Sequence, residues 1–172
     1  MIIPLLLFFL LVTLIHALFL SLAKLSKTED KSKLWKIHYF INGILWLILL
    51  SWIIVIQFSP PTLNFPLGIK LLGFILCLAG SYLTFSSFRK INLKEAMGHR
   101  FFSRSQTKWV SSGVYTYFHN PMYDGFFLVF LGLGFLAGIG ADFILAGASF
   151  LLLNVFLASI ESLSSQLTWR II

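Results

Sequence analysis

Three predominantly apolar runs of more than twenty residues each constrain the fold of this chain more than any other feature. They extend over Ile2–Ala23, Ile37–Phe58 and Leu67–Phe88, and a helix that crosses the hydrocarbon core of a bilayer needs about 20 such residues. Two shorter runs, about Tyr123–Gly138 and Phe143–Ile160, are joined by a glycine-rich turn and predict a tight helical hairpin. We therefore expect an all-α polytopic membrane protein with about five transmembrane helices.

The composition excludes a soluble domain and a disordered chain. Hydrophobic residues make up 58% of the sequence and charged residues 11%, whereas soluble domains are roughly half apolar and a quarter charged. Disorder requires low hydrophobicity. Five spans and their connections use most of the 172 residues, so we expect one integral-membrane domain over residues 1–172. The single cysteine, Cys77, excludes an intrachain disulfide.

The basic residues are concentrated in two loops. A net charge of +7 would point to nucleic acid in a soluble protein. Here, however, eleven of the thirteen lysines and arginines fall in the loops at about 24–36 and 89–120. Five spans place both loops on the same side, as the positive-inside rule requires. We therefore expect no nucleic-acid partner, a bilayer around the chain, cytosolic basic loops, an outside amino terminus and a cytosolic carboxyl terminus. The sequence leaves the oligomeric state open.

A polar segment, Gly113–Gly125, precedes the fourth apolar run. Within it, Asn120 is a good helix N-cap and Pro121 is favoured at the first helical position, so a helix start alone explains part of the pattern. A helix N-terminus also presents free N–H groups that bind a carboxylate or a phosphate. From the residues alone, a helix cap and a ligand site are equally good explanations.

The same segment carries a family resemblance. The residues Gly113-Val114-Tyr115, then Asn120-Pro121-x-Tyr123-x-Gly125, then a hydrophobic hairpin that closes at Glu161, resemble the isoprenylcysteine carboxyl methyltransferase and phospholipid methyltransferase superfamily. The front half is similar to the branch that contains methanethiol S-methyltransferase, at His16-Ala17, Trp35–Asn42 and Phe88–Glu95. The resemblance covers most of the chain.

The resemblance implies an integral-membrane methyltransferase that uses S-adenosylmethionine and needs no metal. The implied acceptor is lipophilic or small: a thiol, a prenylcysteine carboxylate or a phospholipid amine. The implied cofactor-binding residues are Tyr115, Tyr117, His119, Asn120, Pro121, Tyr123, Gly125 and Glu161. The tyrosine rings would attract the sulfonium of the cofactor by cation–π interaction. Glu161 is expected to hold the amino or ribose groups of the cofactor. The N–H groups after Asn120 are expected to hold its carboxylate. His119 is the expected catalytic residue, as a hydrogen-bond donor or a base.

Three departures from the family pattern leave a second hypothesis open. His119 stands where the family usually has arginine, Glu161 lacks the usual second glutamate, and the family's tyrosine-containing tail is missing after Ile172. The alternative is a catalytically inactive member of the same fold that acts as a membrane interaction or sensor protein.

Three histidines, His16, His38 and His119, raise a third possibility, a haem or quinone protein. Two axial haem ligands should lie at similar depth on facing helices. At 1.5 Å per residue, His16 is expected about 10 Å deeper than His38, which opposes this pair. We expect His16 to form a hydrogen bond within the bundle, and Asn154 to face the bundle.

Two further local features are predicted. Asn92 and Glu95 resemble a capping box for a short helix that Gly98 ends, and we expect its apolar residues, with Phe101 and Phe102, on the membrane surface. The Gly134-x-x-x-Gly138 spacing predicts close helix packing within the hairpin.

Overall fold

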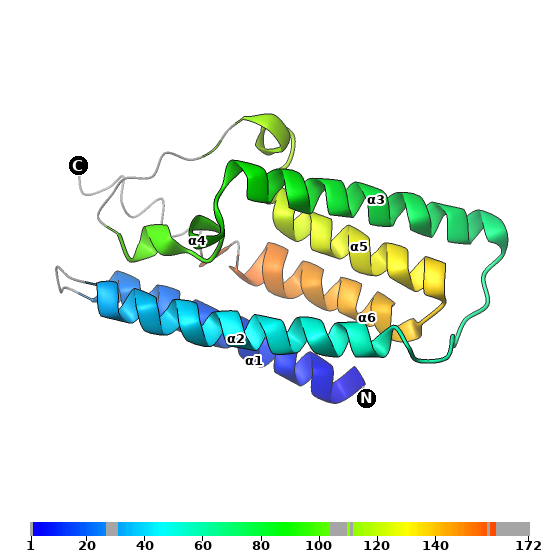
Figure 1. Ribbon diagram of the computed structural model, residues 1–172, viewed down its shortest axis with the longest axis horizontal. Coiled ribbons are helices and arrows are strands. Elements are labelled where there is room, and N and C mark those ends of the chain that lie inside the picture. Colours follow the sequence, from blue (N-terminus) through cyan, green and yellow to red (C-terminus); the bar gives the residue numbers. More distant parts are fainter. Residues whose placement is uncertain (1, 27–30, 104–109, 111, 158, 161–172) are drawn as a thin grey trace.

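The computed structural model describes residues 2–26, 31–103, 110, 112–157 and 159–160, and its regular elements are all helical (Figure 1). The long helices are α1 (Ile2–Leu25), α2 (Ser32–Ile56), α3 (Leu67–Lys90), α5 (Pro121–Ala137) and α6 (Gly140–Ser149), which continues as the π-helix η3 (Phe150–Leu157). The short elements are α4 (Leu93–Ala96), η1 (His99–Phe101) and η2 (Gly113–Thr116). Four segments are long and apolar enough to cross a membrane, and α5 is a shorter apolar helix of 17 residues. The predicted all-α polytopic fold is confirmed.

The helices extend beyond the apolar runs at the end of the bundle that holds α4. Helix α2 begins at Ser32, five residues before the expected Ile37, and α1 continues to Leu25. A helix remains stable past the hydrocarbon boundary because its backbone hydrogen bonds are internal, and long lysine side chains reach the polar surroundings. Lys31 also donates from Nζ to the carbonyl of Ala23 in the last turns of α1. The connection between α1 and α2 is therefore shorter than the loop predicted at 24–36.

The main core lies where α1, α2, α5 and the α6–η3 segment meet. Its fully buried side chains include Leu5 and Phe9 from α1, Leu49 from α2, and Leu145 and Leu153 from the hairpin. A bilayer gives no hydrophobic driving force between helices, so close packing and polar contacts hold such a bundle together.

Helices α3 and α5 touch backbone to backbone through glycines. A Cβ added at Gly132 would lie 2.6 Å from the carbonyl oxygen of Gly73, and a Cβ at Gly80 would lie 2.6 Å from that of Gly125. Of the predicted hairpin glycines, Gly134 does face the Phe143 ring of α6, at 3.0 Å from an added Cβ. The tightest glycine contacts between two helices nevertheless join α3 to α5.

The end of the bundle away from α4 is fastened by a few polar contacts. Gly138 adopts the left-handed conformation with φ 70° and ends α5. Its carbonyl accepts from the N–H groups of Thr62 and Leu63, at 2.9 and 2.8 Å. Gln57 Nε2 donates to the buried carboxylate of Asp142 at 2.8 Å. These bonds tie the turn of the hairpin to the connection between α2 and α3.

Candidate functional site

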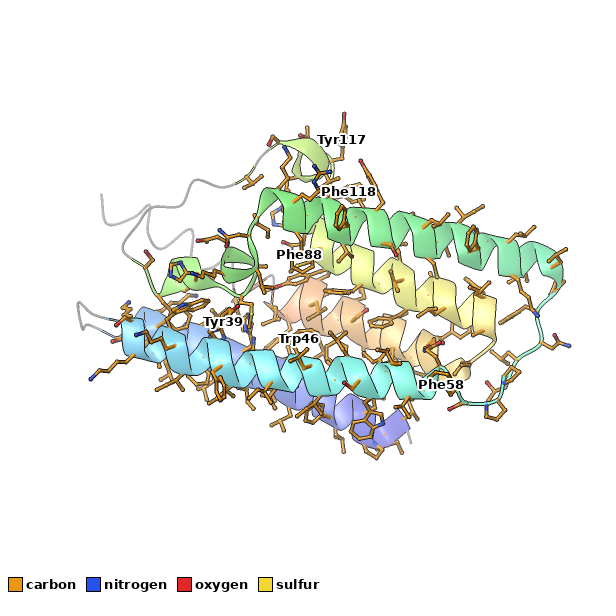
Figure 2. All side chains as sticks on the ribbon, viewed as in Figure 1. Tyr39, Trp46, Phe58, Phe88, Tyr117 and Phe118 are labelled. Atoms are coloured by element: carbon orange, nitrogen blue, oxygen red, sulfur yellow. The ribbon has the colours of Figure 1, made fainter. Side chains whose placement is uncertain are left out.

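A cleft of about 510 Å³ lies between α2 and α5, near the end of the bundle that holds α4. Helix α2 packs against α1, and α3 packs against α5. Residues from both pairs line the cleft. In Figure 2, Tyr39 and Trp46 on α2 lie opposite Phe88 on α3 across this space. Small-molecule sites usually have volumes of about 300 to 1,000 Å³ and mostly apolar linings, so this cleft has the size and character of a ligand site.

The cleft opens toward the lipid side of α2. Phe40 and Leu47 line it, yet they are 69% and 66% exposed. Because α2 is long and apolar enough to cross a membrane, we expect its exposed face around these two side chains to meet hydrocarbon. A molecule dissolved in the bilayer therefore reaches the cleft without crossing a polar surface.

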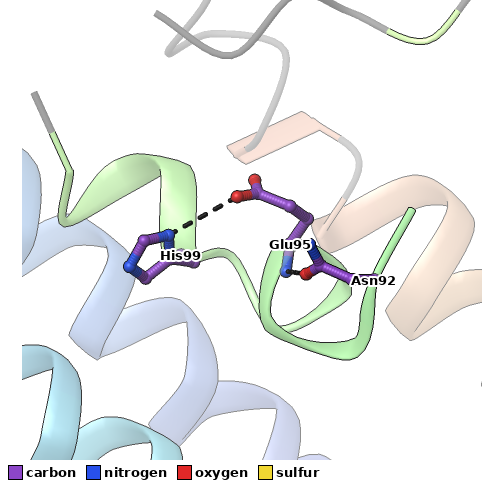
Figure 3. A network of polar contacts seen from close by, with 3 residues as sticks. All are labelled: Asn92, Glu95 and His99. Carbon is purple, nitrogen blue, oxygen red and sulfur yellow. Dashed lines mark hydrogen bonds and ion pairs between the residues drawn. The ribbon is translucent and has the colours of Figure 1, made fainter. Parts of the chain in front are cut away.

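Helix α4 covers one end of the cleft, and its ends are fixed as the sequence predicts. The Asn92 side chain accepts a hydrogen bond from the Glu95 N–H at 2.9 Å, and Gly98 takes a positive φ of 83° directly after the helix. The Glu95 carboxylate lies 3.4 Å from His99 Nδ1 (Figure 3). These contacts hold Leu93 and Met97 against the cleft.

Phe102 corrects one surface prediction. It is 7% exposed, and its ring stacks on the ring of His38, with 5.1 Å between centroids. The segment after α4 therefore enters the bundle instead of lying wholly on the membrane surface.

Three polar side chains form a buried cluster beside the cleft. His16 Nδ1 lies 3.0 Å from His38 Nε2 and 2.9 Å from Asn42 Nδ2. The expected hydrogen bond of His16 within the bundle is confirmed, but the expected depth difference between the histidines is wrong. Because α2 begins at Ser32, His38 lies well inside its helix and meets His16 at the same level.

The predicted cofactor residues at the start of α5 divide into two groups. Tyr123 is 7% exposed and lines the cleft. Asn120 and Pro121 occupy the expected cap and first helical positions, although the Asn120 side chain forms no cap bond. Gly125 is buried in the α3–α5 contact, where an added Cβ would meet the Thr84 hydroxyl.

The second group lies before α5. Tyr115 is half-buried in η2, whereas Tyr117 and His119 are exposed, Tyr117 at 85%. Figure 2 shows Tyr117 and Phe118 on the outer side of α3, away from Tyr39 and Trp46. Glu161 lies outside the described residues. Of the predicted set, the structure thus brings Tyr123 to the cleft and leaves Tyr117 away from it.

The first turn of α5 offers fewer free N–H groups than expected. Pro121 has none, and the N–H groups of Tyr123 and Asp124 both donate to the Asn120 carbonyl, each at 3.0 Å. The Met122 N–H is the remaining donor of this turn. The prediction of several free N–H groups after Asn120 is therefore wrong, because proline and a tight first turn remove them.

Sequence reasoning missed two features near this turn. The chain after Ser149 forms a π-helix, a rare geometry that occurs often at functional sites. Asn154 of this π-helix lies beside the carboxylate of Asp124, which is also near His119. Asn154 thus faces the bundle as expected. The spacing of the last apolar run gave no signal of the π-helix.

Comparison with known proteins gives one match. A family model described as phospholipid methyltransferase matches residues 69–166, which is more than half of the chain. The matched part contains α3, α4, the segment from Gly113 to Gly125 and the hairpin. No curated protein and no solved structure matches the chain. The match confirms the predicted superfamily, and the methanethiol branch stays a prediction.

Proposed function

The chain belongs to the phospholipid methyltransferase family, and from that premise we propose that it is a membrane methyltransferase that uses S-adenosylmethionine and methylates an acceptor bound in the cleft. The observation that carries the proposal is the position of Met122 and Tyr123. Both line the cleft, and both belong to the Asn120–Gly125 segment that carries the family resemblance. A cofactor at this turn would adjoin an acceptor in the cleft.

The residues around this turn fit such a cofactor. The Asn120 side chain is not used as a helix cap, so its amide is available to a ligand, and the Met122 N–H and the His119 ring are further donors. Tyr123 presents an aromatic ring on the cleft, of the kind that attracts a sulfonium. When bound, S-adenosylmethionine supplies an electrophilic methyl group.

The role of the chain is then to align and enclose the reactants. Methyl transfer is an in-line displacement that gains most from fixed geometry and exclusion of bulk water. The apolar walls of α2 and the cover formed by α4 provide the enclosure. We retain Tyr115, Tyr117, His119, Asn120, Pro121, Gly125 and Glu161 with Tyr123 as the proposed cofactor set, and His119 as donor or base.

The proposed orientation follows from the basic loops. The carboxyl end of α1, the amino end of α2, α4 and η2 lie at one end of the bundle (Figure 1), and we propose that this end faces the cytosol. The proposed acceptors are a thiol, a prenylcysteine carboxylate or a phospholipid amine.

Calorimetric titration of the purified protein with S-adenosylmethionine and S-adenosylhomocysteine tests the cofactor. We expect a micromolar Kd, which corresponds to about −8 kcal/mol. Tyr123→Ala should weaken binding, whereas Tyr82→Ala, on an exposed position of α3, should not. His119→Arg should strengthen binding, because arginine is a stronger anion clamp than neutral histidine. A folded protein that binds neither compound would refute the proposal and favour the inactive alternative.

A further inference from the structure

The cluster of His16, His38 and Asn42 lies at membrane depth and has no part in the proposed cofactor set. Its three side chains are at most 5% exposed. Polar side chains within a membrane are costly unless they bind one another or a ligand. The hydrogen bonds of the cluster decide between these two cases.

The hydrogen bonds leave the cluster incomplete. Asn42 Nδ2 donates to His16 Nδ1, because an amide nitrogen only donates. His16 Nδ1 is then an acceptor, and His38 Nε2 donates to it as well. This assignment leaves Asn42 Oδ1 and His38 Nδ1 as buried acceptors with no partner among the described residues. An unpaired buried polar atom destabilises the protein, so a bound donor would complete the cluster.

Of these two acceptors, Asn42 Oδ1 belongs to a residue that lines the cleft, as His16 does. His38 does not line it, and three aromatic rings enclose His38 with centroid distances of 5.1 to 5.7 Å. The lining also includes Tyr39, Trp46 and Tyr123, which carry polar atoms, but it is mostly apolar. The cluster therefore places one unpaired hydrogen-bond acceptor beside a mostly apolar cleft.

The lining of the cleft has no formal charge that would pair with a charged ligand. Among the described residues that line it there is no lysine, arginine, aspartate or glutamate. A carboxylate or phosphate would find no cation there and would lose its hydration without compensation, whereas a neutral hydrogen-bond donor would not.

We propose that the cleft binds an uncharged amphiphile whose polar end donates a hydrogen bond to Asn42 Oδ1 and whose apolar tail lies along α2. This inference rests on the proposed function in that such an amphiphile is the methyl acceptor. It selects the uncharged members of the proposed acceptor class over a carboxylate.

The test measures binding of three ten-carbon probes to the full chain in nanodiscs of zwitterionic lipid, with empty nanodiscs subtracted. The probes are 1-decanol, decyl methyl ether and decanoate. We expect 1-decanol to bind at least tenfold more tightly than the other two. In Asn42→Leu, the affinity for 1-decanol should fall at least tenfold, while the affinity for the ether should be unchanged. Asn64→Leu, at an exposed residue between α2 and α3, is the matched control.

Equal affinities of the alcohol and the ether for the wild-type protein would overturn the proposal, as would tighter binding of decanoate. This comparison needs no variant, so it decides the matter even if Asn42→Leu fails to fold. The experiment uses no cofactor and no turnover. Failure of S-adenosylmethionine to bind and failure of the uncharged probe to bind are therefore separate results.

Discussion

The glycine contact between α3 and α5 allows a prediction whose size follows from the structure. An alanine methyl at Gly80 would lie 2.6 Å from the Gly125 carbonyl oxygen and 2.8 Å from the Val129 nitrogen. Ordinary contacts begin at 3.4 Å, so α3 and α5 would have to separate by roughly 0.8 Å at this point. Both neighbouring atoms belong to the backbone, so a change of side-chain rotamer cannot relieve these two clashes.

We expect Gly80→Ala to destabilise the α3–α5 contact by about 2 to 3 kcal/mol, the upper part of the usual range for overpacking. The change in helix propensity acts in the opposite direction, by about 1 kcal/mol or less. Gly147→Ala on α6 is the matched control, because an added Cβ there meets nothing within 4 Å. That variant should be neutral or slightly stabilised.

Cys77, the single cysteine, reports on this contact. Its Sγ lies 3.7 Å from the Val129 carbonyl oxygen, across the interface. The assay is the rate at which a maleimide labels Cys77 in detergent. Cys77 is partly exposed in the closed bundle, so only the part of its labelling that needs the helices to separate follows the open population. In Gly80→Ala that part should be roughly 30 to 150 times faster, since about 1.4 kcal/mol is a factor of ten. Equal rates for wild type, Gly80→Ala and Gly147→Ala would refute the close contact.

Three further predictions concern the cleft, its cover and the far end of the bundle. Gly43→Trp should fill the cleft and weaken binding of a ten-carbon probe at least tenfold, whereas Gly68→Trp, equally unobstructed but outside the cleft, should not; calorimetry in nanodiscs checks both. Asn92→Ala removes the cap of α4 and should speed hydrogen exchange of its amides by an amount that corresponds to about 1 kcal/mol; an unchanged rate would show that the cap is unimportant. Gln57→Leu leaves the buried carboxylate of Asp142 unpaired and should cost about 1 to 3 kcal/mol in unfolding experiments, and the double variant with Asp142→Leu should recover most of that loss.

The hydropathy of the chain predicted the existence and order of the helices well, because the bilayer forces each apolar run to satisfy its own backbone. Helix ends were predicted where a side chain or a glycine marks them. Asn92 caps α4 as expected, Pro121 begins α5, and Gly98 follows α4 in a left-handed conformation. These are local effects, and local sequence contains them.

Partners between helices could not be predicted in the same way. Glycine spacing shows which face of a helix lacks large side chains. It does not show that Gly125 and Gly132 contact α3. The predicted depth of His38 was wrong because the apolar run begins at Ile37, whereas the helix itself begins at Ser32. The π-helix that carries Asn154 contacts α5, and no local pattern in the sequence predicted its geometry.

The lipid-side opening of the cleft beside Phe40 and Leu47 has a consequence for kinetics. A substrate that arrives from the bilayer diffuses in two dimensions, and the protein responds to its mole fraction among the lipids. Addition of inert lipid would raise the apparent KM when KM is expressed as an amount of substrate. A change in the volume of buffer would not alter that amount. Rates measured in detergent micelles would therefore depend on the ratio of substrate to detergent.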